Sequence, residues 1–394
     1  MKRFVMFVLV TFGVLLTGCT RIETGEVGVR VGFDKQIQSG ELRSWRKPSL
    51  AYSPVQSDIK SIYKLLGGSL NPPVWLEFQQ DVDIVTGPVA DTSDFRVYYT
   101  SSSFGPRKTN YALATSGGAA PYPNSYYEMG VPAPTGAPTL SASGGTSPTE
   151  TRAYIYTFVS QFGSVLEESA PSPAATVTCN TSGSTVLVNG FSAPPAGNYN
   201  FVYKRIYRSV TGASTNNYQL VAQIPIATAS YNDSMSVTAL GQVLPSLYYT
   251  PPPSTLQGIV AMPNGILAGF TGNQVWFCEP YLPHAWPSSY MLTTEYPIVG
   301  LGVFGSTLFV GTTKNPYLIT GTTPSAMSQE KLPITQPCVA KRSIVSDQYG
   351  VLYSSPNGLI SISSAGQEIA TSALFTRDEW QAINPNSIIG CIYN

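Results

Sequence analysis

Three stretches of this sequence repeat one pattern at a constant interval: NGILAGF at 264–270, GSTLFVG at 305–311 and YGVLYSS at 349–355. Each leads into an asparagine that is followed by a second apolar run. These asparagines are Asn273, Asn315 and Asn357, and both intervals between them are 42 residues. An apolar run, a tight turn and another apolar run predict a β-hairpin in every unit. A hairpin unit repeated about every 40–45 residues is typical of propeller blades. The alternative is three unrelated hairpins in a sandwich.

The preceding sequence also predicts strands separated by turns. Before a Pro-, Gly- and Ser-rich segment at 131–138, which predicts an extended linker, short β-branched or aromatic runs occupy 59–65, 74–78, 81–85 and 96–100. After it, TRAYIYTFVS at 151–160 alternates, and further runs lie at 184–188, 203–209 and 218–224. Short alternating strands at this spacing predict a β-sandwich. Its motifs YIYTFVS, KRIYRS, YQLVAQI and SYNDS resemble a fibronectin-type-III module.

The predicted fold class is therefore all-β, with partial β-propeller-like repeats and an inserted fibronectin-III-like β-sandwich. A propeller needs about four to eight blades to close. We expect residues 45–130 to supply missing blades, and the final run at 387–394 looks like the first strand of another unit, which predicts a C-terminally incomplete propeller. The predicted divisions are a signal segment (1–19), a short strand and junction (20–43), a β-rich platform (44–130), the linker (131–138), the sandwich (139–250) and the repeats (251–394).

The composition excludes several classes of function. Only 11% of the 394 residues are charged, against about 25% in ordinary soluble proteins. The formal net charge is zero, so the strongly basic character of many nucleic-acid-binding proteins is missing. The five cysteines are far apart and form no CxxC motif, so neither a zinc site nor a disulfide framework is predicted. We predict no catalytic residues, no metal and no cofactor.

The chain contains one histidine, His284, in a proline-bounded aromatic loop. A single histidine removes most Ser-His-Asp, Cys-His and His-metal schemes. We expect His284 to pack or to form a hydrogen bond.

The N-terminus has the features of an export signal. Lys2 and Arg3 precede an apolar run at 4–16, and LTGC at 16–19 resembles the lipobox of bacterial lipoproteins. This resemblance implies lipid attachment at Cys19 if the chain is exported; a signal peptide with an incidental cysteine is the alternative. TGEVGVRV at 24–31 resembles the first strand of the stomatin/prohibitin-like family, whose long helical region is absent here.

From about residue 38 onward the sequence resembles phage tail nozzle proteins, which are similar to tail-tubular protein B. The matching pieces occur in order: SGELRSWRKP, IKSIYKL, WLEFQQDVDIVTGPVADTSDFRVYYT, YIYTFVSQFGSVLEESAPSP, KRIYRSVTG, QPCVAKRSIVSDQYGVLYSSPNGLISIS and LFTRDEWQAINP. The resemblance implies a homo-oligomer, a hexamer, that contacts portal, adaptor and other tail proteins in the virion. It also implies a conduit through which DNA passes without being read, and it carries no catalytic residues. The lipoprotein-like start has no place in such a protein, and SGEL at 39–42 is the predicted junction between the two parts.

The basic pairs Arg46-Lys47, Arg107-Lys108 and Lys341-Arg342 could face DNA. They are equally well explained as solvated surface charges.

Two other functions remain open. The LTGC motif favours an outer-membrane lipoprotein that binds glycans or surface partners, with an aromatic loop of Trp276, Tyr281 and Trp286 to stack sugars. A glycosidase would need paired carboxylates. The candidate pairs are Asp81 with Asp83, on one face of a strand, and Glu167 with Glu168.

Overall fold

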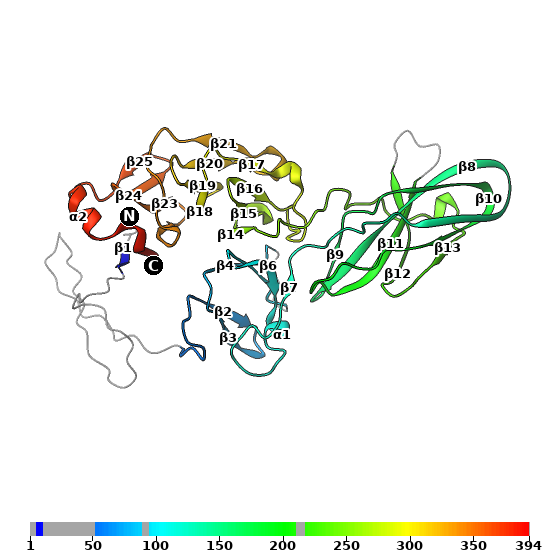
Figure 1. Ribbon diagram of the computed structural model, residues 1–394, viewed down its shortest axis with the longest axis horizontal. Helices are drawn as coiled ribbons and strands as arrows, with labels where there is room; N and C mark the ends of the chain where they lie inside the picture. The colour runs from blue at the N-terminus through cyan, green and yellow to red at the C-terminus, as the bar shows by residue number, and fades with distance from the viewer. Residues whose placement is uncertain (1–4, 11–51, 89–93, 210–216, 394) are drawn as a thin grey trace.

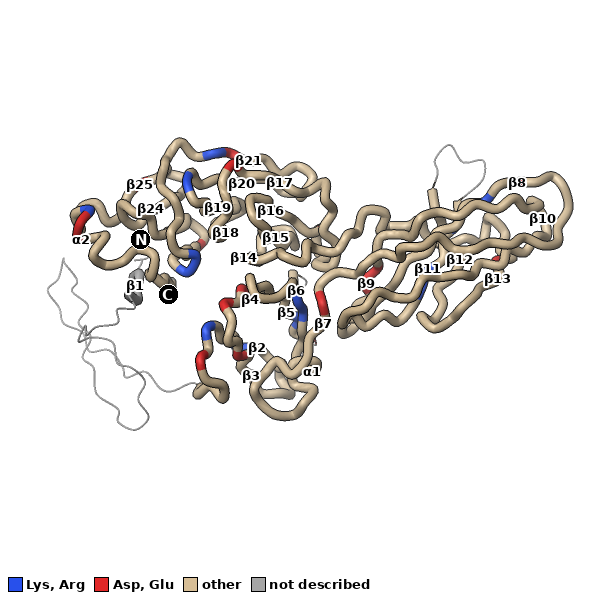
Figure 2. The backbone as a smooth tube through the Cα atoms, in the orientation of Figure 1, with Lys and Arg blue, Asp and Glu red and all other residues tan. Residues whose placement is uncertain are grey.

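The computed structural model describes residues 5–10, 52–88, 94–209 and 217–393, and it is almost entirely β-structure (Figure 1). An elongated sheet projects from one side of a group of shorter antiparallel sheets. The all-β prediction is therefore confirmed. Charged positions are sparse along the backbone, as Figure 2 shows.

Three consecutive four-stranded antiparallel meanders follow residue 256. In each of them neighbouring strands in the chain are also neighbours in the sheet. The strands are β14 (Gln257–Ala261), β15 (Leu267–Thr271), β16 (Gln274–Phe277) and β17 (Leu292–Thr293); β18 (Ile298–Phe304), β19 (Thr307–Thr312), β20 (Tyr317–Thr320) and β21 (Ser328–Lys331); and β22 (Val345–Ser346), β23 (Gly350–Ser355), β24 (Gly358–Ser363) and β25 (Gly366–Ile369).

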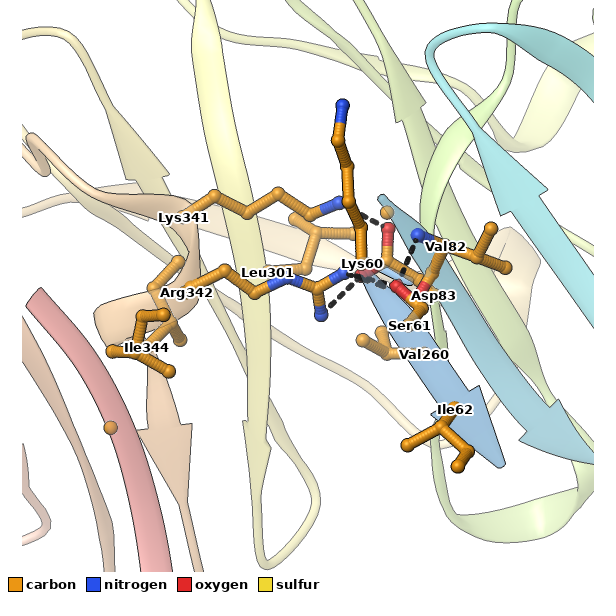
Figure 3. A pocket seen from close by; sticks show the side chains of 13 residues that line it. Lys60, Ser61, Ile62, Val82, Asp83, Val260, Leu301, Lys341, Arg342 and Ile344 are labelled. Carbon is orange, nitrogen blue, oxygen red and sulfur yellow. Dashed lines mark hydrogen bonds and ion pairs between the residues drawn. The ribbon is translucent and has the colours of Figure 1, made fainter. Parts of the chain in front are cut away.

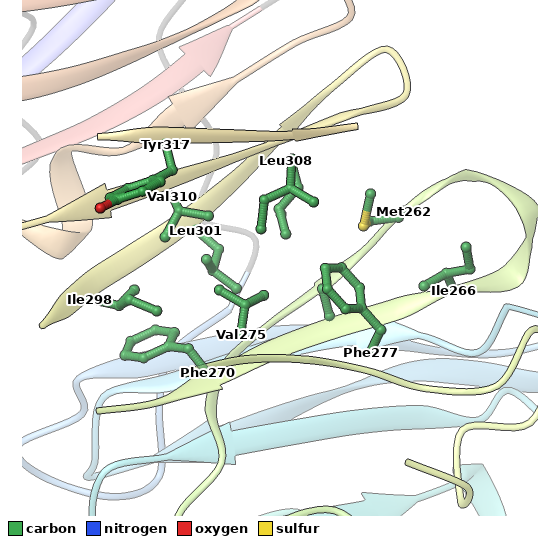
Figure 4. Close-up of a cluster of buried hydrophobic side chains, with 12 residues drawn as sticks. Met262, Ile266, Phe270, Val275, Phe277, Ile298, Leu301, Leu308, Val310 and Tyr317 are labelled. Carbon is green, nitrogen blue, oxygen red and sulfur yellow. The ribbon is translucent and has the colours of Figure 1, made fainter. Parts of the chain in front are cut away.

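These meanders pack face to face, as blades do. Along β19, Leu308 and Val310 point into a core shared with the β14–β17 meander, where they meet Phe270 and Val275 (Figure 4). Phe309, between them in sequence, belongs instead to the core shared with the β22–β25 meander. Because successive side chains of a strand point to opposite faces, a strand between two neighbouring sheets buries every residue. This explains why β19 contains the continuous apolar run LFVG, at 308–311, rather than an alternation.

The segment expected to supply further blades forms one more meander and a hairpin. The meander consists of β4 (Val82–Thr86), β5 (Val97–Ser101), β6 (Phe104–Thr109) and β7 (Tyr127–Glu128), and β4 lies beside β14. The hairpin is β2 (Ser61–Gly67) with β3 (Asn71–Phe78), and the short helix α1 (Tyr111–Ala114) lies near β2. Every residue of β5 is buried, because Tyr98 packs toward β14 and Tyr99 toward the hairpin.

The inserted region forms a curled six-stranded antiparallel sheet in the order β12-β11-β8-β10-β13, with β9 pairing to the end of β8. It wraps around an apolar core that includes Tyr156, Phe158, Val186 and Ile206. A single continuous sheet therefore provides both walls of the predicted sandwich. Its strands are β8 (Thr139–Phe162), β9 (Val165–Glu168), β10 (Ala175–Asn189), β11 (Phe201–Ser209), β12 (Tyr218–Pro225) and β13 (Tyr231–Asp233).

The sequence-based strand at 151–160 was too short. β8 begins twelve positions earlier, at Thr139, because β10 pairs with it as far as Asn189↔Thr139. The added segment is rich in Gly and Ser and has no apolar alternation, so the partner strand decides its conformation. Residues 131–138 before it form no strand or helix, and Val131 packs into the core of the curled sheet.

The last described segment begins with α2 (Arg377–Ala382), whose N-cap Thr376 forms a capping box with Glu379. It ends in β26 (Ile388–Tyr393), which pairs antiparallel with β1 (Val5–Val10). Part of the apolar run expected as a signal is thus a strand. None of the helices in the described ranges is long and apolar enough to cross a membrane. The 3₁₀ turns are η1 (Val237–Ala239), η2 (Pro263–Gly265), η3 (Ser288–Tyr290), η4 (Pro324–Ala326), η5 (Lys341–Ser343) and η6 (Pro385–Ser387).

Candidate functional site

The first strands of the meanders converge on one pocket of about 440 Å³ (Figure 3). The contributing meander strands β4, β14 and β18 are each the first strand of their sheet, and η5 directly precedes β22, the first strand of the last meander. The β2–β3 hairpin and β26 complete the wall. The lining residues are Lys60, Ser61 and Ile62 near β2, Val82 and Asp83 on β4, Gly258 and Val260 on β14, Leu301 on β18, Lys341, Arg342 and Ile344 around η5, and Ile389 and Gly390 on β26.

A four-charge cluster closes one side of this pocket. Lys341 Nζ lies 2.5 Å from Asp83 Oδ2 and 3.5 Å from Asp81 Oδ2. Arg342 forms an ion pair with Asp81, and its Nη1 lies 3.7 Å from Asp83 Oδ1. Arg342 Nη2 also donates to the Val82 carbonyl, at 3.2 Å. Two aspartates thus neutralise two cations, and the cluster joins the beginning of the platform to the last complete meander.

The described side chains of these basic pairs have partners within the fold. Lys341 and Arg342 are held by aspartates. Lys108 is fully buried against Glu167, while the Arg107 guanidinium lies over two aromatic rings, 4.2 Å from the Phe104 centroid and 3.9 Å from that of Tyr126. The interpretation as a solvated surface charge is wrong for Lys108, because this side chain is buried. The polar sequence FGPRKT gives no sign of that burial. Arg46 and Lys47 lie outside the described residues.

The candidate carboxylate pairs do not form an open acid–base site. Asp81 and Asp83 are occupied by the cations of η5. Glu167 and Glu168 point to opposite sides of β9: the first contacts Lys108, and the second pairs with Arg205 and accepts a 2.6 Å hydrogen bond from the Tyr207 hydroxyl. Each carboxylate of the two pairs thus forms an ion pair with a cation from another element of the fold.

The repeated asparagines lie in the turns between the second and third strands of the three meanders, and each side-chain amide bonds to a segment that connects two meanders. Asn273 Nδ2 donates to the Thr294 carbonyl at 2.9 Å. Asn315 Nδ2 donates to the carbonyls of Leu332 and Ile334. Asn357 Nδ2 donates to Gln336 Oε1. The equivalent positions therefore hold the outer connections of the meanders in place.

His284 and its aromatic loop are mostly buried. His284 lies edge-on to Tyr249, with ring centroids 5.8 Å apart, so the expected packing role is present. Its Nε2 has no hydrogen-bond partner among the described residues. Trp286 is fully buried and Trp276 is partly buried, whereas Tyr281 is 54% exposed. The three aromatic residues do not form an exposed surface on which a sugar could stack.

Sequence reasoning missed the buried group formed by Lys108, Glu167 and His284. Burial disfavours the Glu167 carboxylate, but the attraction of the Lys108 ammonium and the hydrogen bonds from Lys108 and Ser160 act together to hold the pKa of Glu167 below its ordinary value. Burial lowers the pKa of His284 to about 4, although the Glu167 carboxylate opposes this. The imidazole is therefore neutral near pH 7.

Comparisons with known proteins name no family. The chain matches no model of a known protein family, and a search of curated proteins finds no similar sequence. The lipidation candidate Cys19, the strand expected at 24–31 and the junction at 39–42 lie outside the described residues.

Proposed function

We propose that this chain is a structural protein of a phage virion, a tail nozzle or connector that forms part of the DNA-ejection conduit. One observation carries the proposal. The segments on which the nozzle resemblance rests also supply the contacts that join the parts of the fold: Asp81 and Asp83 lie in WLEFQQDVDIV, and Lys341 and Arg342 lie in QPCVAKRS. The resemblance to nozzle proteins rests on segments that are distant in the sequence. Contact between these segments in the structure supports the proposal.

The charge arrangement supports a conduit more than a DNA-binding role. Each Lys or Arg that contacts a phosphate adds affinity, which would retard passing DNA. In this chain Lys108, Lys341 and Arg342 are neutralised by carboxylates within the fold. The proposed assembly is a homo-oligomer, a hexamer, between portal or adaptor proteins and the outer tail proteins.

The test is co-purification with virions. Particles from a lysate are banded by density, and their proteins are digested and identified by mass spectrometry. Peptides from the platform, the curled sheet and the meanders should follow the major tail proteins through banding. A peptide spanning Arg30 to Arg43 in the same particles would establish that the two parts of the sequence are one virion protein. Absence of the chain from infectious particles would overturn the proposal.

The second candidate function is a lipid-anchored outer-membrane protein, which the LTGC motif at 16–19 favours. Labelling with a fatty-acid analogue, followed by membrane fractionation, distinguishes the two. Label that appears on the chain and disappears in Cys19→Ser, together with outer-membrane sedimentation and absence from virions, would favour this alternative.

A further inference from the structure

Three polar side chains are buried together where the curled sheet meets the β4–β7 meander. Lys108 on β6, Glu167 on β9 and His284 from the loop after β16 are 0%, 2% and 4% exposed. Lys108 contacts Glu167 across this joint. The group is independent of the pocket and of the proposed function.

The Lys108 ammonium is poorly provided with acceptors. An ammonium group has three donors, yet within the described part of the chain its hydrogen bond goes to Glu167. Its other near neighbour is the Phe162 ring, with Nζ 5.1 Å from the centroid. Removing two charges from water costs free energy that their attraction repays only with further hydrogen bonds. In the described part of the chain this carboxylate receives one further hydrogen bond, from Ser160 Oγ at 3.4 Å.

His284 Nε2 is a buried ring nitrogen without a hydrogen-bond partner in the described part of the chain, close enough to Lys108 and Glu167 for their charges to act on it. Its side chain lines a cavity of about 100 Å³ together with Glu167, Arg96, Tyr98 and Pro88. A water molecule needs roughly 10–15 Å³ of such space. The cavity therefore has room for a released water beside the carboxyl group.

We propose that Lys108 and Glu167 condense to an intramolecular isopeptide bond that fastens the curled sheet covalently to the β4–β7 meander. One proton passes from Lys108 Nζ to the Glu167 carboxylate, which gives a neutral amine and a neutral acid. Nζ attacks Cδ of Glu167. A second proton passes from the nitrogen to the leaving hydroxyl, and His284, in the same buried group, is the base proposed to carry it. One C–N bond forms, one C–O bond breaks and one water leaves, with no oxidant or cofactor.

The product removes the unfavourable feature of the joint, because an amide carries no charge. Both reacting groups come from strands that hold them in contact, which reduces the entropic barrier to reaction. The exposed pair Lys331–Glu295 has the same residue types, but its side chains are 41% and 53% exposed. Water solvates both of those ions, so the same reaction is not favoured there.

Trypsin digestion of the full chain with peptide mass spectrometry tests the proposal. The expected product is a branched peptide that joins 108–152 to 153–204, with a mass lower than the sum of the two by one water. Lys108→Arg keeps the charge and should abolish the branch. Lys331→Arg, the matched exposed control, should leave it unchanged. His284→Gln keeps both reacting groups and should lower the linked fraction several-fold.

Finding only the unbranched peptides in the folded wild-type protein would overturn the proposal. An equal linked fraction in His284→Gln would remove His284 from the reaction. The measurement is made on internal peptides, so it does not depend on N-terminal processing or on virion association. Its failure would leave the proposed function untouched.

Discussion

Lys341 Nζ donates a 2.5 Å hydrogen bond to Asp83 Oδ2, although 258 positions separate the two residues in the chain. Asp83 lies on β4, the first strand of the first meander. Lys341 lies in η5, just before β22, the first strand of the last meander. The contact joins the two ends of the row of meanders around the pocket.

Asp83→Asn should weaken that connection. Loss of the carboxylate leaves Lys341 and Arg342 sharing only Asp81, and breaking a partly buried charged hydrogen bond costs about 1–3 kcal/mol. Urea unfolding should show the corresponding fall in the free energy of unfolding. Glu295→Gln, which breaks the exposed pair with Lys331, serves as the control and should show no measurable change. Equal effects of the two substitutions would contradict a closing role for Asp83.

Phe309→Ala should destabilise the packing between two meanders. Phe309 is fully buried and stacks on Tyr353, with ring centroids 5.0 Å apart. Truncating a buried phenylalanine costs about 3–5 kcal/mol. Leu374→Ala, at a side chain that is 72% exposed, should change the free energy of unfolding by less than about 0.5 kcal/mol. Thermal unfolding of the two variants side by side measures the difference.

The three repeat asparagines should not be equivalent. Asn315 is 8% exposed, and its amide bonds to two backbone carbonyls, so Asn315→Ala leaves buried acceptors without a donor. This should cost about 1–3 kcal/mol in chemical unfolding. Asn357 bonds to a glutamine side chain near solvent, and Asn357→Ala should cost less than about 1 kcal/mol. A larger loss at Asn357 would be inconsistent with this ranking.

The Arg208–Asp233 pair should be the most sensitive ion pair of the curled sheet. Both side chains are buried, and Asp233 also accepts a 2.7 Å hydrogen bond from the Tyr154 hydroxyl. Removing one member of a buried pair costs about 3–5 kcal/mol, because the other charge is left without compensation. Asp233→Asn should therefore lower the free energy of unfolding by this amount. A loss below about 1 kcal/mol would indicate that water reaches Arg208.

His284 gives the chain a specific acid sensitivity. Its pKa is about 4 in the folded protein, against 6.5 for an unperturbed histidine. As pH falls between these values, the unfolded chain takes up a proton that the folded chain does not, so stability decreases. His284→Gln should flatten the upper part of this slope in unfolding measured at several pH values. Since His284 is the only histidine, an unchanged slope would contradict its burial in the neutral form.

Much of the strand structure could be predicted from the sequence, because strand formation and turn chemistry are local. The 42-residue interval placed Asn273, Asn315 and Asn357 at equivalent points, and the structure has a turn at each. The runs around Tyr98, Phe158 and Tyr207 were predicted as strands for the same reason. The segment at 139–150 was not, because its conformation depends on β10, a partner some forty positions away in the register.

The candidate site was largely beyond sequence reasoning. Neither the segment around Asp83 nor the segment around Lys341 marks the other as its partner. Their contact depends on how many meanders lie between them and on how each meander packs on the next. Lys108 sits in a strand without an apolar pattern, and only the approach of β9 and the His284 loop removes it from water. Burial of a polar side chain depends on neighbours that its own segment does not specify.

The sequence by itself determined an all-β protein of low charge, with a repeated hairpin unit and alternating strands in an inserted region. Side-chain periodicity and turn residues act over a few positions, and they are sufficient for that result. The tertiary structure alone decided which charges neutralise one another and that the first strands of the meanders line one pocket. It alone also decided that Lys108, Glu167 and His284 are buried together. These features arise from packing between distant segments, where exclusion of water, and not local conformation, sets the energy of each contact.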